Sequence, residues 1–168
     1  MKRLSKYYIF APASACSGGP EALHQLAYYM RMCGLESYIV YYDKTNFVDA
    51  TPIERYLQYE PHIISYRDIL DVKSNYCIAP ENAAWCLNAI RKARRCIWWL
   101  SWHYRDVEHP SIIQKLIYFK RKILKQTLEN ARFVLYNDAK CMHLCSSKYA
   151  YEYVNQKYPH AKVRYLVE

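Results

Sequence analysis

Ser17, Gly18 and Gly19 are the residues best suited to binding a ligand, because they lie between an apolar run and an amphipathic segment. Glycines let a ligand approach backbone N–H groups closely, and the start of a helix attracts negative charge. A phosphate or sugar oxygen could therefore bind there. The stretch lacks both the G-x-G-x-x-G dinucleotide motif and the lysine that follows a phosphate-binding loop. A purely structural turn is the alternative, with Glu21 as a first-turn carboxylate that stabilises the helix.

Glu81, Ser101 and His103 form a second group of polar residues, which follows two further apolar runs. A histidine at a strand end can donate to a phosphate or a sugar hydroxyl, or act as a base. We therefore predict that His103 is catalytic and that Glu81 and Ser101 bind the ligand. The alternative for His103 and Glu81 is a structural role inside the fold. No Ser-His-Asp order, H-E-x-x-H motif or pair of carboxylates indicates hydrolysis.

The seven cysteines are an odd number and lie in apolar segments, which is typical of buried thiols in a reducing compartment. Cys141 and Cys145 flank His143, and this spacing hints at a metal ion. Structural zinc sites usually need four ligands, and the sequence offers no second pair. We therefore predict no metal site. We interpret residues 142–146 as a strand, at whose carboxyl end Ser146 and Ser147 are candidate binding residues.

The formal net charge of +9 favours an anionic partner. The alternative is that the charge serves only to keep the protein soluble. No recognisable nucleic-acid module is present, so we expect no nucleic-acid partner. The sequence shows no signal peptide and no apolar stretch of roughly 20 residues that could cross a bilayer. These observations predict a cytoplasmic location.

Residues 111–130 predict an amphipathic helix with basic residues largely away from its apolar side. The apolar side comprises Ile112, Ile113, Leu116, Ile117, Ile123, Leu124 and Leu128. One interpretation is a core-facing helix with a solvated back. The other is a helix that lies against acidic lipid, which would attach the protein peripherally to the inner face of a membrane.

Apolar runs alternate with helical segments along the whole chain. We predict strands at residues 7–12, 36–42, 61–66, 76–79, 95–102, 132–136, 142–146 and 162–167. We predict helices that include residues 23–32, 52–57, 82–94, 111–130 and 148–158, with the first stopping at residues 33–34. This order predicts one α/β domain over residues 1–168, with a Rossmann-like three-layer α/β/α architecture and a mainly parallel sheet. In such folds ligands bind beyond the carboxyl ends of the strands.

Four stretches resemble the N-terminal half of a GT-B-fold glycosyltransferase of the retaining, nucleotide-sugar-dependent kind. They are residues 17–26 after the first strand, residues 78–81, residues 98–101 and residues 144–150. Their order and spacing cover nearly all of the chain. In that family two Rossmann-like halves face each other across a cleft, and the N-terminal half mostly binds the acceptor.

The resemblance implies a role for each candidate residue. Gly18 and Gly19 would lie near the donor diphosphate, and His103 near the transferred sugar or the acceptor hydroxyl. Ser146 and Ser147 would lie at the later edge of the cleft. The family needs no bound metal ion, so we expect no cofactor, the nucleotide-sugar being a substrate.

The resemblance ends where the C-terminal, donor-binding half would begin, and residues 165–168 resemble the approach to the interdomain link. We therefore expect an acceptor-side half that transfers a sugar to a glycan or lipid-linked acceptor in surface polysaccharide biosynthesis. A C-terminal half or a partner subunit would supply the donor site, and the chain alone would be inactive. The alternatives are a non-catalytic binding or scaffolding subunit of a split glycosyltransferase, and a stand-alone nucleotide-binding domain.

Overall fold

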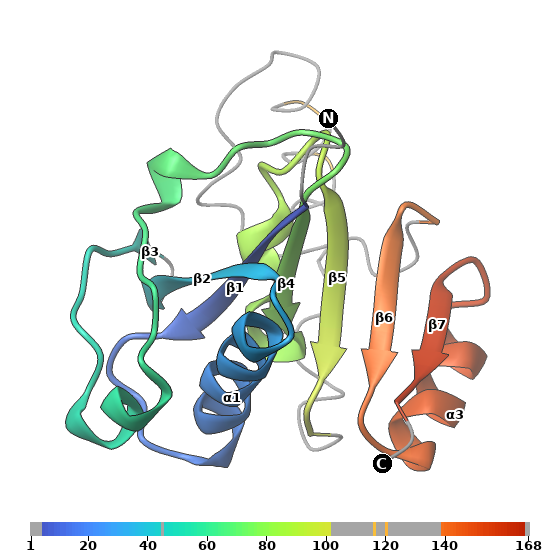
Figure 1. Cartoon of the computed structure of the whole chain (residues 1–168). Coiled ribbons are helices and arrows are strands. Elements are labelled where there is room, and N and C mark those ends of the chain that lie inside the picture. Colours follow the sequence, from blue (N-terminus) through green and yellow to red (C-terminus); the bar gives the residue numbers. More distant parts are fainter. Residues whose placement is uncertain (1–4, 45, 102–115, 117–119, 121–138, 167–168) are drawn as a thin grey trace.

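The computed structural model describes residues 5–44, 46–101, 116, 120 and 139–166. Its centre is a seven-stranded sheet in the order β3-β2-β1-β4-β5-β6-β7 (Figure 1). The strands are β1 (Lys6–Pro12), β2 (Glu36–Asp43), β3 (Asn46–Phe47), β4 (Tyr76–Pro80), β5 (Arg94–Trp99), β6 (Cys141–Cys145) and β7 (Lys162–Tyr165). Among them β3 alone pairs antiparallel with its neighbour. The predicted Rossmann-like α/β fold with a mainly parallel sheet is confirmed.

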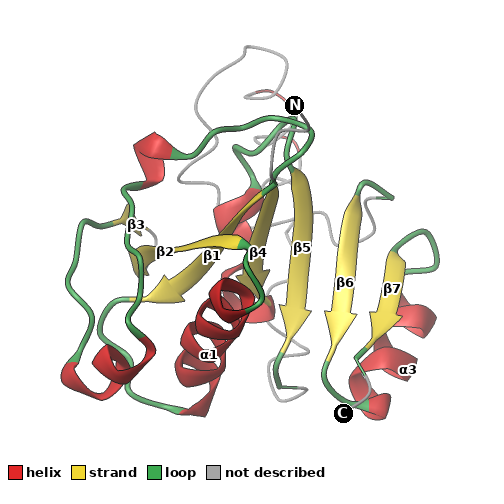
Figure 2. Cartoon of the chain, in the orientation of Figure 1, coloured by secondary structure: helices red, strands yellow, loops and turns green. Residues whose placement is uncertain are grey.

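Helical segments cover both faces of this sheet. They are α1 (Gly18–Met32), α3 (Lys148–Lys157) and the 3-10 helices η1 (Glu54–Tyr59), η2 (Tyr66–Asp68) and η3 (Glu81–Leu87). On one face Leu23 of α1 joins an apolar cluster with Ile9 of β1. On the other face Ala84 of η3 and Val154 of α3 join a cluster with Phe10, because successive residues of a strand point to opposite faces. Figure 2 shows α1 in front of the sheet and α3 behind it.

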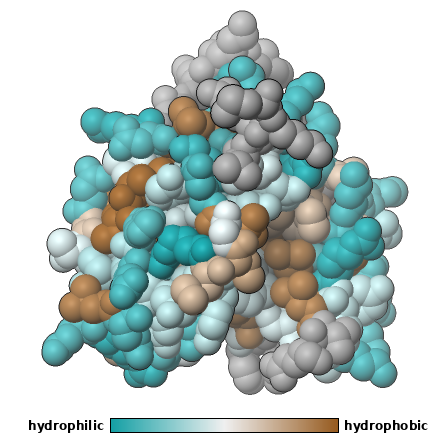
Figure 3. All heavy atoms as spheres, in the orientation of Figure 1, coloured by the Kyte–Doolittle hydropathy of each residue, from teal (hydrophilic) through white to brown (hydrophobic). Residues whose placement is uncertain are grey.

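The opening unit β1-α1-β2 follows the sequence prediction closely. Helix α1 ends at Cys33 and Gly34, where Gly34 has a φ of +77° and donates its N–H to the Arg31 carbonyl at 2.8 Å. A residue with a side chain is strained in that conformation, so this glycine is the stop signal that the sequence indicated. Figure 3 shows the face that carries α1, on which hydrophilic residues surround separate hydrophobic clusters.

The predicted helix over residues 82–94 is wrong. Only η3 forms, with an irregular residue at Ala83, and β5 already begins at Arg94. Apolar residues of this stretch are nevertheless buried, among them Ala83, Leu87, Ile90 and Ala93. The carboxylate of Asp71 instead accepts the backbone N–H groups of residues 91–93 at 3.0, 2.9 and 2.7 Å. A distant side chain therefore satisfies the backbone groups that a helix would have paired.

Smaller differences concern the ends of elements. The strand expected at residues 61–66 is one bridge between Ile39 and Ile63, and the helix expected at residues 52–57 is η1. Strand β5 ends at Trp99, before the predicted end at residue 102. The strand at residues 132–136 lies outside the described residues, as does the helix at residues 111–130 apart from residues 116 and 120.

All seven cysteines lie in the described part of the chain, and all are free thiols. Cys16 and Cys33 are exposed, whereas the other five are buried. Burial raises the pKa of the Cys96 and Cys145 thiols to about 12, so both stay protonated at neutral pH. These buried cysteines act as small apolar residues of the core, as their positions in apolar runs indicated.

Candidate functional site

A cavity of about 430 Å³ opens at the carboxyl ends of β1, β2, β4 and β5. Its wall includes the first turn of α1, residues 80–82 and residues 100–101. The chain leaves β1 towards β2 through α1, whereas β4 pairs with the opposite side of β1. The cavity therefore lies at the point where the strand order reverses, which is where parallel α/β sheets bind ligands.

The first turn of α1 presents two unpaired backbone N–H groups to this cavity. Ser17 precedes the helix, its N–H donates to the Tyr56 hydroxyl at 3.2 Å, and its carbonyl accepts from the Glu21 N–H at 3.1 Å. Proline at position 20 has no N–H to offer. The N–H groups of Gly18 and Gly19 have no acceptor among the described residues, because the first turn of a helix lacks partners within the helix.

The fold itself makes little steric demand for glycine at these two positions. A Cβ atom added to Gly18 would meet nothing within 4 Å, and one added to Gly19 would lie 4.0 Å from Cδ1 of Leu100. Neither residue has a positive φ, in contrast to Gly34. The two glycines leave open space next to their N–H groups, and this space is part of the cavity.

A buried hydroxyl fixes the loop that leads into α1. Tyr56, which is 1% exposed, accepts the Ser17 N–H and donates its own proton to the Ala15 carbonyl at 3.0 Å. Its ring stacks on His24, with the ring centroids 4.2 Å apart. Tyr56 comes from η1, so this segment determines where the first turn of α1 lies.

His24 extends the same network into the core and is fully buried. Burial lowers its pKa and raises the pKa of Tyr41 to about 12, so both side chains are neutral at pH 7. The neutral ring donates from Nδ1 to the Pro20 carbonyl at 2.7 Å and accepts from the Tyr41 hydroxyl at Nε2 at 2.9 Å. Sequence reasoning missed His24 and Tyr56. The position of His24 beside Leu23 and before Ala27, on the buried side of α1, is the signal that could have indicated a core role for it.

Glu81 lies at the end of β4, lines the cavity and is 4% exposed. Its two carboxylate oxygens accept the backbone N–H groups of Leu100 and Ser101, each at 3.0 Å. Burial raises the pKa of this carboxyl, and the two N–H groups oppose that rise. Glu81 therefore ties the ends of β4 and β5 together, and its carboxylate also forms part of the cavity wall.

Ser146 and Ser147 follow β6 farther along the same edge of the sheet. The Ser146 hydroxyl accepts the indole N–H of Trp98 at 2.7 Å, and the Ser147 hydroxyl caps α3 by accepting the Ala150 N–H at 3.1 Å. Neither serine is among the described residues that line the cavity. The predicted binding residues that the structure brings together around the cavity are Ser17, Gly18, Gly19, Glu81 and Ser101.

His103, the predicted catalytic residue, lies outside the described residues. In the described part of the chain no group of three or more histidine, cysteine, aspartate and glutamate side chains is arranged to hold a metal ion. Nor is any helix in that part both long and apolar enough to cross a membrane. In comparisons with protein-family models, curated proteins and solved structures, no match was found for this chain.

The glycine pair can be tested for a structural role by measuring the free energy of unfolding. We expect Gly18→Ala and Gly19→Ala to leave it unchanged or to raise it by up to about 0.5 kcal/mol, because alanine favours a helix and meets no neighbour. Gly34→Ala is the matched control and should lower it by about 1 kcal/mol, because of the positive φ. A loss at Gly18 or Gly19 as large as that at Gly34 would mean that the fold demands the pair.

The pH dependence of stability tests the environment of Glu81. Its pKa in the folded chain lies above the ordinary value of 4.5, so the folded state binds the proton more tightly than the unfolded chain does. The stability that the Glu81 carboxyl contributes is fully present at a pH below its ordinary pKa, and it is lost as the pH rises through the raised pKa. As the pH rises over that interval, the free energy of unfolding of the wild type should therefore fall relative to that of Glu81→Gln. A difference that is constant with pH would contradict the raised pKa.

Proposed function

We propose that this chain is the acceptor-side half of a GT-B-fold glycosyltransferase and that its cavity binds a hydroxyl-rich acceptor. The observation that carries the proposal is the composition of the cavity wall. It combines the free N–H groups of Gly18 and Gly19 with the buried carboxylate of Glu81, and its described lining contains no lysine or arginine.

Sugar hydroxyls suit this wall because they can both accept and donate hydrogen bonds. One hydroxyl can accept from a helix N–H, while another donates to a carboxylate oxygen of Glu81. A diphosphate, by contrast, would bring its charges next to that carboxylate, and the described lining residues include no lysine or arginine to offset them. The balance of donors and charges therefore favours a neutral acceptor over a nucleotide in this half.

The proposal departs from the family resemblance at Gly18 and Gly19, which the resemblance would place near the donor diphosphate. Its remaining parts follow the resemblance. A C-terminal half or a partner subunit supplies the nucleotide-sugar site, and His103 acts near the transferred sugar or the acceptor hydroxyl. The acceptor is a glycan or a lipid-linked sugar of surface polysaccharide biosynthesis, and the reaction takes place at the cytoplasmic side of a membrane.

A nucleotide-binding or scaffolding domain is the second candidate function. The start of α1 supports it, because the helix dipole and the free N–H groups of Gly18 and Gly19 attract anions. This candidate predicts that a nucleoside diphosphate binds to the chain in the absence of any partner.

Calorimetry distinguishes the two functions. We expect heat of binding when the chain is titrated with oligosaccharides from a panel of bacterial-type surface glycans, and none with nucleoside diphosphates. Gly19→Val fills the space beside the N–H groups and should weaken oligosaccharide binding by roughly tenfold or more, without lowering the melting temperature. Met32→Val is the matched control, because Met32 lies at the other end of α1 and is 69% exposed.

Two results would contradict the proposal. One is nucleoside diphosphate binding by the chain alone that Gly19→Val abolishes, which would support the nucleotide-binding function. The other is oligosaccharide binding that is equally strong in the wild type and in Gly19→Val, which would move the acceptor away from this cavity.

A further inference from the structure

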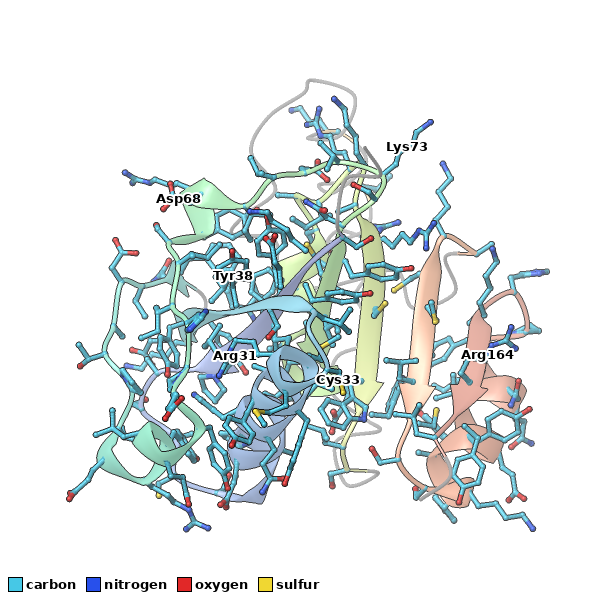
Figure 4. The ribbon with its side chains drawn as sticks, in the orientation of Figure 1. Arg31, Cys33, Tyr38, Asp68, Lys73 and Arg164 are labelled. Atoms are coloured by element: carbon cyan, nitrogen blue, oxygen red, sulfur yellow. The ribbon has the colours of Figure 1, made fainter. Side chains whose placement is uncertain are left out.

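Basic side chains gather at the edge of the sheet opposite the cavity. Strands β1, β4, β5, β6 and β7 are parallel, so their first residues lie along one edge, which we call the amino edge. The exposed basic residues at the starts of these strands and in the turns before them include Lys73, Arg91, Lys92, Arg94 and Lys162. Figure 4 shows Lys73 at the end of the molecule where β4 and β5 begin. These residues extend from β4 to β7, which is three strand spacings of about 4.8 Å, so the band of positive charge is roughly 14 Å long.

Among the described residues, carboxylates also lie at this end of the molecule, but they are fewer than the basic residues. They are Asp71, Glu36 and the exposed Asp68, which comes two residues before Leu70 (Figure 4). Asp71 accepts the three N–H groups of residues 91–93, and Glu36 forms an ion pair with Lys6 at 3.1 Å. Asp71 keeps its negative charge, so the amino edge is basic because its exposed lysines and arginines outnumber these carboxylates.

An exposed leucine lies within the same edge. Leu70 is 47% exposed, although its backbone is fixed at both ends. Its N–H donates to the Tyr8 hydroxyl at 3.2 Å, and its carbonyl accepts from the Asn75 side chain at 2.8 Å. The loop thus exposes an aliphatic side chain three residues before Lys73.

We propose that the amino edge binds the surface of an acidic membrane. Lysine and arginine side chains near anionic headgroups each strengthen binding, and a leucine among them can enter the headgroup region. A nucleic-acid backbone could bind the same basic side chains, but it offers no apolar region that Leu70 could enter. The observations therefore favour lipid. The inference rests on the charges and on Leu70, and it is independent of what the cavity binds.

Vesicle co-sedimentation tests this surface with two variants of equal charge. One variant, Lys73→Gln/Arg91→Gln/Lys92→Gln/Lys162→Gln, removes four charges from the amino edge. The other, Lys115→Gln/Arg121→Gln/Lys122→Gln/Lys125→Gln, removes four charges from the predicted helix at residues 111–130. Arg94 is kept, because its guanidinium lies over the ring of Tyr76 at 5.0 Å and contributes to packing. Melting temperatures check that both variants fold.

The wild type should bind phosphatidylglycerol-containing vesicles at low salt, should not bind phosphatidylcholine vesicles, and should dissociate at high salt. Each basic residue contributes roughly a fivefold factor, so the amino-edge variant should bind roughly a hundredfold or more weakly. The helix variant should stay close to the wild type. Leu70→Ser should weaken vesicle binding severalfold and leave the salt dependence unchanged.

Four outcomes would overturn the proposal. They are no binding of the wild type to acidic vesicles, equal losses in the two charge variants, a greater loss in the helix variant, and binding to an RNA or DNA oligonucleotide without binding to vesicles. Equal losses would mean that only net charge matters. A greater loss in the helix variant would assign the membrane surface to residues 111–130.

Discussion

The position of the first turn of α1 depends on one buried hydroxyl, that of Tyr56. This group accepts the Ser17 N–H and donates to the Ala15 carbonyl, so the loop between β1 and α1 has a single arrangement. The same contact removes the Ser17 N–H from ligand binding and leaves the N–H groups of Gly18 and Gly19 available. His24 and Tyr41 support Tyr56 from inside the core, and both are neutral at pH 7. The chemistry of the cavity follows from this constraint, since it decides which donors face the ligand.

The parts of the fold that depend on local sequence were predictable. Apolar runs indicated the strands of the described sheet except β3, and Gly34 was recognised as the end of the first helix. The helix predicted over residues 82–94 does not extend to its expected end, where Asp71, 20 to 22 residues earlier in the sequence, pairs the N–H groups of residues 91–93. No local pattern records such a contact.

The candidate site was predictable to a similar extent. Gly18, Gly19 and Glu81 follow strands, and the carboxyl ends of parallel strands meet at one edge, so their proximity could be expected. What Glu81 does there could not be expected, because its partners are the backbone N–H groups of Leu100 and Ser101, which follow the neighbouring strand β5. Tyr56 was missed for the same reason, since its hydrogen bonds join segments that are distant in the sequence. His24 was missed although its position on the buried side of α1 could have indicated a core role.

The two proposals concern opposite ends of the same strands. A strand of seven residues such as β1 spans roughly 20 Å, which separates the amino edge from the cavity. If both proposals hold, the cavity lies about that far from the lipid surface. An acceptor anchored in the membrane would then have to be a glycan long enough to extend over this distance, rather than a single sugar on a lipid.

The most direct measurement of the central claim uses the amide signals of the three glycines in an NMR titration. Gly18 and Gly19 report on the cavity, and Gly34 reports on the far end of α1. Addition of an acceptor oligosaccharide should shift the amide signals of Gly18 and Gly19 and leave that of Gly34 in place, whereas a nucleoside diphosphate should shift none of the three. Shifts of Gly18 and Gly19 with the nucleoside diphosphate alone, or no shift with any oligosaccharide, would contradict the account.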